Sequence, residues 1–461
     1  MTNTIPAVGP ARNAAQHGSR PVRRWALRIR AVTARRRRAR AVLVLAAAVS
    51  VAVGATVPAI AAAPPVQNRV VSENPVDWTP HALDGSVYQA VQVGTRIFVC
   101  GSFTRVRNAD STMPLSLPHI MAFNARTGRI DTSFRPAPDD TVHAMAVAPD
   151  GRSLYIGGNF SRVGGMVTPR VARISTTSGA PLSSFRVATI SGNVERLALA
   201  GNRLIIGGSF QRVGGILRPG LASLSPASGA VTAALTTRLA GPRSTANGTT
   251  TSIKVTDLAV SPDQRRLIVI GNFNQVGGLA RYQLAVLDLT TSPVRVANWS
   301  TLRFRPNCSG VFPTYLRGIA IAPSSTWFVI TDTGGPSGPQ CDSVTRFSLT
   351  RTGNVTPTWV NNTGGDTLLS AAITNAAVYV GGHQRWLNNG GGHDSAGPGA
   401  VSRPGIGAVS PTTGRALAWN PTKDRGVGVF NIYPTSAGIW ITSDTTHVHK
   451  EYHGRIAFFP L

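Results

Sequence analysis

The twelve residues LYIGGNFSRVGG, at positions 154–165, recur along this chain with few changes. Related strings are IFVCGSFTRV at 97–106, LIIGGSFQRVGG at 204–215 and LIVIGNFNQVGG at 267–278. Their phenylalanines are spaced by 57, 50 and 63 residues: Phe103, Phe160, Phe210 and Phe273. Self-similarity at a period of this size indicates a repeat architecture, in which each repeat is one small structural unit.

Each repeat contains four short segments, most of which alternate apolar and polar residues. The segment 142–149 (VHAMAVAP) is followed by the turn Asp150-Gly151, the GGxF segment, a polar loop and a third segment at 171–175. A Thr-Gly or Ser-Gly turn then leads to an aromatic segment that begins at a residue such as Phe134. Glycine in these turns supplies the positive φ that a tight hairpin needs. The pattern predicts an all-β fold, and four strands per unit are typical of a propeller blade.

Three further segments, at 317–335, 368–386 and 429–445, repeat the pattern less closely. Together with the four clear repeats they predict a seven-bladed β-propeller of four-stranded blades. The last unit ends at Leu461 after its third strand, whereas VDWTP at 76–80 has the aromatic-x-Pro pattern of a fourth strand and belongs to no earlier unit. We therefore expect the N-terminal segment to complete the last blade and close the ring.

The beginning of the chain has the layout of an export signal. Eleven arginines and no acidic residue lie in residues 1–40, an apolar run follows at 41–60, and an A-x-A cleavage pattern ends at Ala61. We predict a signal peptide over residues 1–61 and a single β-propeller domain over residues 62–461. The apolar run is long enough to span a membrane, so an uncleaved anchor is the alternative. Cleavage would give a secreted, extracellular protein with no stable membrane span.

The chain is strongly basic, with 46 Lys and Arg against 19 Asp and Glu. Without the eleven arginines of residues 1–40, 35 basic residues remain and the net charge is about +16. Such an excess favours acidic surfaces or polymers as partners. No helix-turn-helix or RNA-binding signature accompanies the charge, so we do not expect a nucleic acid partner. The alternative is arginine-rich codon usage on a solvated surface, since the chain has only three lysines.

The three cysteines agree with export to an oxidising compartment. Cys308 and Cys341 lie in loops rich in Pro, Gly and Ser on either side of one repeat core. We expect them to form a disulfide. Cys100 lies inside a strand pattern, RIFVCGSF, and we expect it to be a small buried hydrophobic residue.

The motifs also carry a family resemblance. GGxF followed by V-G-G, with a TG-x-x-x-x-x-F pattern in FNARTGRIDTSF at 123–134, resembles the delta-60 repeat β-propeller family of secreted bacterial proteins. The match is clear over four repeats and weaker over three, and it spans residues 87–461. The resemblance implies a propeller and export. It implies no activity, because that family has no agreed one.

The variable residue of the GGxF segment is a candidate for a metal-binding or catalytic role. Around the seven repeats it is Ser102, Asn159, Ser209, Asn272, Asp332, His383 and Asp444. Equivalent strands of neighbouring blades should lie about 10 Å apart, whereas ligands of one metal ion lie within about 2.5 Å of it. Ser, Asn and Asp at one repeated position also suit a bond from the side chain to nearby backbone. We therefore expect a structural role here, and no metal site.

The loop at 383–405 is the better candidate site, because it replaces the short loop of other repeats with about 20 residues. Its candidate ligand-binding residues are His383, Arg385, Trp386, Asn388, Asn389, His393 and Asp394. An exposed Trp beside Arg and Asn offers a stacking face and hydrogen-bonding groups for a sugar or a peptide. The alternative is that Trp386 packs on the blade and the glycines only extend the turn.

These observations predict a non-enzymatic binding or scaffold module for an extracellular glycan or cell-envelope polymer, acting as a monomer without a cofactor. The sequence has no G-x-S-x-G, H-E-x-x-H, EF-hand or P-loop motif, and acidic residues are too sparse to select a glycosidase pair. We assign no catalytic residue. The alternative is a secreted enzyme that acts on polysaccharide, with its site on the propeller face that carries the loop 383–405.

Overall fold

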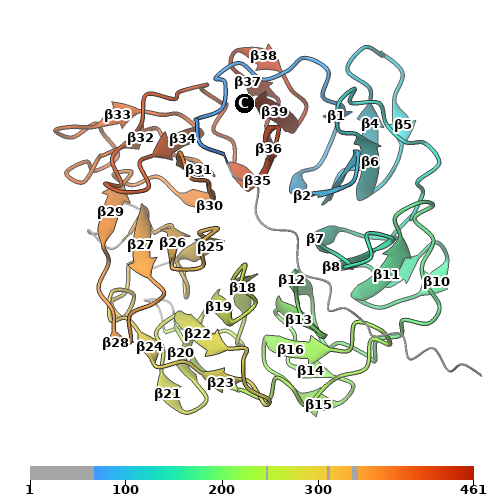
Figure 1. Ribbon diagram of the computed structural model, residues 1–461, viewed down its shortest axis with the longest axis horizontal. Helices are drawn as coiled ribbons and strands as arrows, with labels where there is room; N and C mark the ends of the chain where they lie inside the picture. The colour runs from blue at the N-terminus through green and yellow to red at the C-terminus, as the bar shows by residue number, and fades with distance from the viewer. Residues whose placement is uncertain (1–66, 245–247, 309–311, 335–340) are drawn as a thin grey trace, which may run out of the picture. The chain divides into compact units, whose positions relative to one another are not determined.

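The computed structural model describes residues 67–244, 248–308, 312–334 and 341–461 (Figure 1). Within these residues the chain forms strands, turns and bends, with no α-helix. Among the described residues there is accordingly no helix that is long and apolar enough to cross a membrane. The signal peptide predicted over residues 1–61 lies outside the described part of the chain.

Seven of the sheets repeat one antiparallel pattern, and we number them blades 1 to 7 in chain order. Their first, second and third strands are β2 (Val87–Val93), β3 (Arg96–Gly101) and β6 (Ile120–Asn124) in blade 1; β7 (Val142–Val147), β8 (Ser153–Gly158) and β11 (Val171–Ser175) in blade 2; β12 (Val194–Ala200), β13 (Arg203–Gly208) and β16 (Leu221–Leu224) in blade 3; β18 (Val255–Val260), β19 (Arg266–Gly271) and β22 (Leu284–Asp288) in blade 4; β25 (Leu316–Ile321), β26 (Trp327–Asp332) and β27 (Ser343–Ser348) in blade 5; β30 (Leu368–Ile373), β31 (Val378–Gly382) and β34 (Ile406–Val409) in blade 6; β35 (Val429–Thr435), β36 (Gly438–Ser443) and β39 (Ile456–Pro460) in blade 7.

The first strands of the blades surround a common centre (Figure 1). Each of them contacts the first strand of the next blade, and β35 of blade 7 contacts β2 of blade 1. The described chain therefore forms a closed ring of small antiparallel sheets, which is the arrangement of a β-propeller.

The fourth strands are shorter than the repeats predict. Blades 4 and 5 have one, β23 (Arg295–Val296) and β29 (Trp359–Asn362). In blades 1, 2, 3 and 6 a single bridge links the third strand to the segment after the Thr-Gly or Ser-Gly turn, as between Phe123 and Ile130. The chain then bends inward, and Phe134 becomes fully buried. The expectation of four-stranded blades is corrected here: in blade 1 a turn, in which the amide of Phe134 donates to the carbonyl of Asp131, takes the chain out of the ladder directly after the bridge.

Short hairpins join the second and third strands in blades 1–4, 6 and 7. They are β4 (Arg105–Arg107) with β5 (Leu115–Ser116), β9 (Arg162–Val163) with β10 (Met166–Val167), β14 (Arg212–Val213) with β15 (Ile216–Leu217), β20 (Phe273–Val276) with β21 (Leu279–Ala280), β32 (Trp386–Leu387) with β33 (Val401–Ser402), and β37 (His447–Val448) with β38 (Glu451–Tyr452). The remaining short strands are β1 (His81–Ala82), which pairs with β4; β17 (Leu239–Pro242), which pairs with β20; and β24 (Trp299–Ser300), which pairs with β28 (Gly353–Asn354). The start of each first strand pairs with the end of the second, as Leu368 does with Gly382. The hairpins therefore lie on the side of the ring where the first strands begin, which we call the hairpin face.

The repeated Gly-Gly pair lies where neighbouring blades touch. A Cβ on Gly157 would lie 2.8 Å from Cγ1 of Val194 in the first strand of the next blade. A Cβ on Gly158 would overlap the carbonyl oxygen of Thr141, and the contact between blades recurs at Gly207. A side chain at the second position would overlap a backbone carbonyl in all four clear repeats, which explains why the motif needs glycine there, whereas the first position is Cys100 in blade 1 and Ile270 in blade 4.

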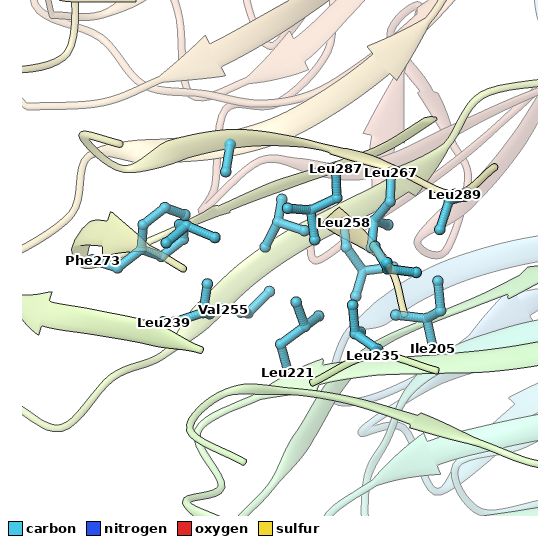
Figure 2. Close-up of a cluster of buried hydrophobic side chains, with 14 of the residues drawn as sticks. Ile205, Leu221, Leu235, Leu239, Val255, Leu258, Leu267, Phe273, Leu287 and Leu289 are labelled. Atoms are coloured by element: carbon cyan, nitrogen blue, oxygen red, sulfur yellow. The ribbon is translucent and has the colours of Figure 1, made fainter. Parts of the chain in front are cut away.

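The hydrophobic core is divided among the spaces between neighbouring blades. Figure 2 shows the cluster between blades 3 and 4. Its labelled residues are Ile205, Leu221, Leu235, Leu239, Val255, Leu258, Leu267, Phe273, Leu287 and Leu289. Phe273 is fully buried, as are Phe103, Phe160 and Phe210 of the other clear repeats. Since burial of a Phe side chain stabilises a fold by roughly 1.5–3 kcal/mol, the phenylalanine of each motif anchors its blade.

The N-terminal segment lies along the edge of blade 7. The amide of Ser72 donates to the carbonyl of Pro460 at 2.7 Å, and the amide of Val76 donates to the carbonyl of Phe458 at 3.0 Å. The ring of Trp78 packs beside this edge, with its centroid 5.9 Å from that of Phe458. The segment is irregular and Trp78 is half-buried, but its hydrogen bonds occupy the position where the other blades place their edge segment.

The cysteines are arranged as the sequence predicts. Cys308 and Cys341 form a disulfide, with their Cα atoms 5.5 Å apart, which is within the usual range. Cys100 is free and fully buried in β3, and burial raises the pKa of its thiol. Both predictions about the cysteines are confirmed.

Candidate functional site

The loop 383–405 starts on the hairpin face, where β31 ends. Its base is fixed by a two-residue ladder, in which Trp386 pairs with Ser402 and Leu387 pairs with Val401. Leu387 is fully buried and packs in the core of blade 6. Trp386 therefore lies on a hairpin whose base is anchored in the core of blade 6 through Leu387.

A buried carboxylate organises the charged residues at the start of this loop. One oxygen of Asp366 accepts hydrogen bonds from the backbone amide and Nε of Arg385, both at 2.9 Å. The other oxygen accepts from Nη2 of Arg385 at 3.1 Å and from Nη2 of Arg425 at 2.8 Å. Nη2 of Arg385 also donates to Asp394 at 2.6 Å. We call these four residues the Asp366 cluster.

The Asp366 cluster holds two guanidinium groups in fixed positions. The side chain of Asp366 is only 4% exposed, whereas those of Arg385 and Arg425 are 31% and 32% exposed. The hydrogen bonds that Arg385 donates to Asp366 raise the pKa of Arg385 above its usual value. Both arginines therefore keep donors at the surface, and each is held in place by a hydrogen bond to the buried carboxylate of Asp366.

Trp386 adds an aromatic surface next to this charge. The guanidinium carbon of Arg385 lies 4.4 Å from the centre of the Trp386 ring, and the indole is half-buried. Trp386 occupies the hairpin position that Arg212 has in blade 3, as their ladder pairs show. Trp386 is thus neither fully exposed nor fully packed on the blade. Its indole packs partly on the loop and is partly open to a ligand.

The two asparagines of the loop are engaged in its own structure. Asn389 is fully buried, and its amide donates to the carbonyls of Thr363 and Ser395, both at 2.9 Å. The side-chain oxygen of Asn388 accepts from the amide group of Asn361 at 2.6 Å. These contacts explain the shape of the loop, and they leave Asn389 without surface area for a ligand.

The two histidines of the loop have different surroundings. Nδ1 of His383 lies against the carbonyl of Gly426, and the carbonyl of His383 accepts from Nε of Arg425 at 2.7 Å. His383 therefore connects blade 6 to the segment that leads into blade 7. His393 is exposed, and the next residue, Asp394, points its carboxylate to Arg385.

The variable residue of the GGxF segment has the structural role that the sequence predicts. In four blades its side chain accepts a hydrogen bond from a backbone amide just before or within the start of the first strand: Ser102 from Ser86, Ser209 from Asn193, Asn272 from Lys254, and Asp444 from Val427. Asp332 is fully buried and accepts from the amide of Ser343 at 2.6 Å, and burial raises its pKa well above the usual value. Within the described ranges no group of three or more His, Cys, Asp and Glu side chains is placed to hold a metal ion.

Two residues of the cluster, Asp366 and Arg425, are absent from the sequence-based list. A signal for Asp366 exists, because an acceptor shortly before the first strand recurs in other repeats. Asp139 accepts from the amides of Ser161 and Arg162 at the start of the blade 2 hairpin, as Asp366 does from Arg385. Arg425 has no such signal, since it comes from the connection to blade 7.

Comparisons with known proteins leave the family of this chain open. No family model matches this sequence, and no curated protein matches it. A solved structure described as the WD40 beta propeller domain of Doa1 is 11% identical, with a TM-score of 0.47, and the match covers 83% of this chain and 94% of that chain. The resemblance to the delta-60 repeat family therefore stays a prediction. The chain is an all-β protein of many small antiparallel sheets with a β-propeller fold.

Proposed function

We propose that this protein is a secreted, seven-bladed β-propeller, closed by its N-terminal segment, that binds an acidic glycan or acidic cell-envelope polymer on its hairpin face. One observation carries the proposal: Asp366 holds Arg385 and Arg425 in place beside the half-exposed Trp386. A β-propeller is often a binding or scaffold module, and this cluster gives the module a specific ligand chemistry.

The chemistry of the cluster matches an acidic sugar. Guanidinium groups bind carboxylate or sulfate through paired charge-assisted hydrogen bonds, and an indole stacks on the apolar face of a sugar ring. Because Asp366 already fixes both arginines, little side-chain entropy is lost when a ligand arrives. The net charge of about +16 outside the basic N-terminus also attracts an acidic polymer.

Binding is better supported than hydrolysis. Both oxygens of Asp366 accept hydrogen bonds from Arg385 or Arg425, so this carboxylate is occupied within the protein and does not face a ligand as a general acid would. Asp394 is likewise engaged by Arg385.

We further propose that residues 1–61 are removed on export. N-terminal sequencing of secreted protein would then begin at Ala62. Recovery of the full chain from the membrane would contradict this.

The test is a comparison of affinities for an acidic and a neutral polysaccharide, such as polygalacturonate and dextran, by isothermal titration calorimetry. Trp386→Ala removes the stacking surface, which should weaken binding of the acidic polymer about tenfold, since about 1.4 kcal/mol corresponds to a factor of ten. Dextran should bind weakly to both proteins.

The chain offers a matched control on its opposite face. Trp327 begins β26, away from the hairpin face, and the guanidinium carbon of Arg346 lies 4.2 Å from its ring centre. Trp327→Ala therefore removes a similar stacked indole without touching the proposed site, and it should leave the affinity unchanged. Equal losses in the two variants, or equal affinity for both polymers, would contradict the proposal. Release of reducing ends from the polymer would favour the polysaccharide-degrading alternative.

A further inference from the structure

The first strands, which surround the centre of the ring, carry a β-bulge in each of the seven blades of the described chain. In every blade the register between the first and second strands shifts by one residue near the hairpin face, which is a β-bulge. The shifts lie between Val87 and Gln89, Val142 and Ala144, Val194 and Arg196, Val255 and Asp257, Leu316 and Gly318, Leu368 and Ser370, and Val429 and Asn431. A bulge redirects side chains and leaves backbone groups unpaired by the ladder. Here the redirected residues surround one central space.

That space is a cavity of about 140 Å³ lined by residues from all seven first strands. Its lining includes Tyr88, Gln89, His143, Arg196, Asp257, Ser370, Phe430 and Asn431. An apolar cavity of roughly this size holds one benzene molecule, so the space suits a small organic molecule or one end of a larger one.

Two amide side chains in this lining have a fixed orientation. Oε1 of Gln89 accepts from the backbone amide of Met145 at 2.5 Å, and Oδ1 of Asn431 accepts from that of Ala90 at 3.1 Å. A backbone N–H can only donate, so in both side chains the oxygen must face the neighbouring blade. The NH₂ groups of Gln89 and Asn431 are then left as donors, and neither bonds to any residue that the structure describes.

The charged pair in the lining adds a further donor and no free acceptor. Nε of Arg196 donates to Oδ1 of Asp257 at 2.9 Å, and the amides of Leu258 and Ile319 donate to the two oxygens of the same carboxylate. The Nη2 group of Arg196 has no partner among the described residues. The polar groups that remain for a ligand are therefore mostly N–H donors.

One side of the cavity is aromatic. The ring of Tyr88 lies between two others, with centroid distances of 5.1 Å to Phe430 and 5.4 Å to His143. These rings come from blades 7, 1 and 2, whereas Arg196 and Asp257 come from blades 3 and 4. A ligand in the cavity thus meets aromatic surface and the amide donors of Gln89 and Asn431 from blades 1 and 7, and the Arg196 donor from blade 3.

We infer that the cavity at the centre of the ring binds a small organic carboxylate. Its acid group would accept hydrogen bonds from the NH₂ groups of Gln89 and Asn431 and from Arg196, while its carbon skeleton packs on Tyr88 and Phe430. This site is separate from the Asp366 cluster and does not depend on the function proposed for it. The carboxylate belongs either to a free small acid or to the acidic end of a polymer.

The first experiment uses the unaltered protein. Benzoate and its uncharged analogue benzamide are titrated while saturation-transfer NMR and calorimetry follow binding. Benzoate should bind at least about tenfold more tightly, because only its carboxylate accepts strong charge-assisted bonds from three donors. Equal affinity for the two compounds, or no binding of benzoate, would overturn the inference. Competition of benzoate by a short oligogalacturonate would identify the polymer end as the source, and its absence would point to a free acid.

The second experiment exchanges the donors alone. Gln89→Glu and Asn431→Asp keep an oxygen for the backbone amides of Met145 and Ala90, but they replace each NH₂ group by an oxygen. Benzoate binding should fall at least about tenfold in each variant. Gln275→Glu makes the same change on the exposed surface of β20 and should have no effect. Unchanged binding in Gln89→Glu and Asn431→Asp would overturn the inference.

Two controls keep the result interpretable. Thermal unfolding of Gln89→Glu and Asn431→Asp shows whether the ring is intact, and if it is not, the benzoate and benzamide comparison decides alone. Trp386→Ala should bind benzoate as the unaltered protein does. If Trp386→Ala also lost benzoate, the ligand would lie at the Asp366 cluster and not in the central cavity.

Discussion

At the scale of single residues, Gly157 determines how closely blades 2 and 3 approach. The spacing is set by contact of the backbone at Gly157 with Val194 of the next blade, where a Cβ would lie 2.8 Å from Cγ1. The sequence predicts the motif but not this reason for it, since the contact joins different repeats. The same limit applies to Asn389, whose burial depends on Thr363 and Ser395 lying close to it in the folded loop.

Gly157→Ala should destabilise the protein by about 1–2 kcal/mol. Overpacking of a core costs roughly 1–3 kcal/mol, whereas replacing glycine lowers the entropy of the unfolded chain and returns about 0.4–1 kcal/mol. Gly391→Ala is the matched control, because its Cβ would meet only Pro398 at an ordinary 3.7 Å. Urea unfolding at pH 7 measures both variants. A stability loss in Gly391→Ala as large as that in Gly157→Ala would show that packing between blades is not the cause.

At the scale of elements, the short strand β1 connects the N-terminal segment to both neighbouring blades. β1 pairs with β4 of blade 1, and the ring nitrogen Nδ1 of His81 accepts from the amide of Gly454 in blade 7 at 3.1 Å. His81 is 4% exposed. Burial, with smaller contributions from Arg107 and His453, lowers the pKa of His81 from 6.5 to about 4.

The lowered pKa of His81 should make the folded protein less stable at acidic pH. Between pH 6.5 and about 4 the unfolded chain binds a proton at His81 and the folded chain does not, so stability falls as the pH falls. Below pH 4 both states bind the proton and this loss ends. The full loss of stability from His81 is up to about 3 kcal/mol.

His81→Asn isolates this contribution, because its side-chain oxygen can still accept from Gly454 but does not titrate. Urea unfolding of both proteins at pH 7, 5.5 and 4 should show a smaller loss of stability in the variant. The half-buried His143 contributes equally to both proteins and cancels in the difference, whereas His453, which helps to lower the pKa of His81, is affected by the substitution. Parallel pH profiles for the two proteins would contradict the assignment to His81.

At the scale of the whole molecule, closure of the ring depends on residues far apart in sequence. The N-terminal segment bonds to the edge of blade 7, and it also reaches blade 6, where Nε1 of Trp419 donates to the carbonyl of Ser72 at 3.0 Å. Val71 is buried in the same region, in the core between blades 6 and 7. The segment therefore joins the last two blades to the first.

Deletion of residues 68–80 should destabilise the ring by at least about 3 kcal/mol, because it removes these hydrogen bonds, the buried Val71 and the packing of Trp78. It should also promote aggregation, since an unpaired sheet edge is exposed. Thermal unfolding and light scattering measure the two effects. A soluble deletion variant with an unchanged melting temperature would show that the segment does not close the ring.

A finer version of this test changes one hydrogen bond. Val76→Pro removes the amide that donates to Phe458, whereas Asp77→Pro introduces proline at an exposed neighbouring position whose amide has no bond to the described residues. Val76→Pro should lower the melting temperature more than Asp77→Pro does. Equal effects would mean that the bond to Phe458 contributes nothing measurable.

The fold could be predicted from the sequence to a greater extent than the site. The repeats, the turn glycines and the VDWTP segment at 76–80, which belongs to no earlier repeat, are local patterns. They predict the propeller and the place of the N-terminal segment beside blade 7. The length of the edge strands could not be predicted in this way, since the buried aromatic residue ends a turn outside the ladder in blade 1 (Phe134) but lies within the paired strand in blade 5 (Trp359). The loop 383–405 could be located as an insertion, but the partners of Asp366 could not, since Arg425 lies in the connection to blade 7 and reaches Asp366 only in the folded chain.

The central claim is that an acidic polymer binds at Arg385, Arg425 and Trp386 on the hairpin face. A crystal structure of residues 62–461 with a short oligogalacturonate tests it most directly. We predict a ligand carboxylate about 3 Å from the guanidinium groups of Arg385 or Arg425, with a sugar ring against Trp386. An oligosaccharide bound on the opposite face, or on the hairpin face without touching these three residues, would contradict the account.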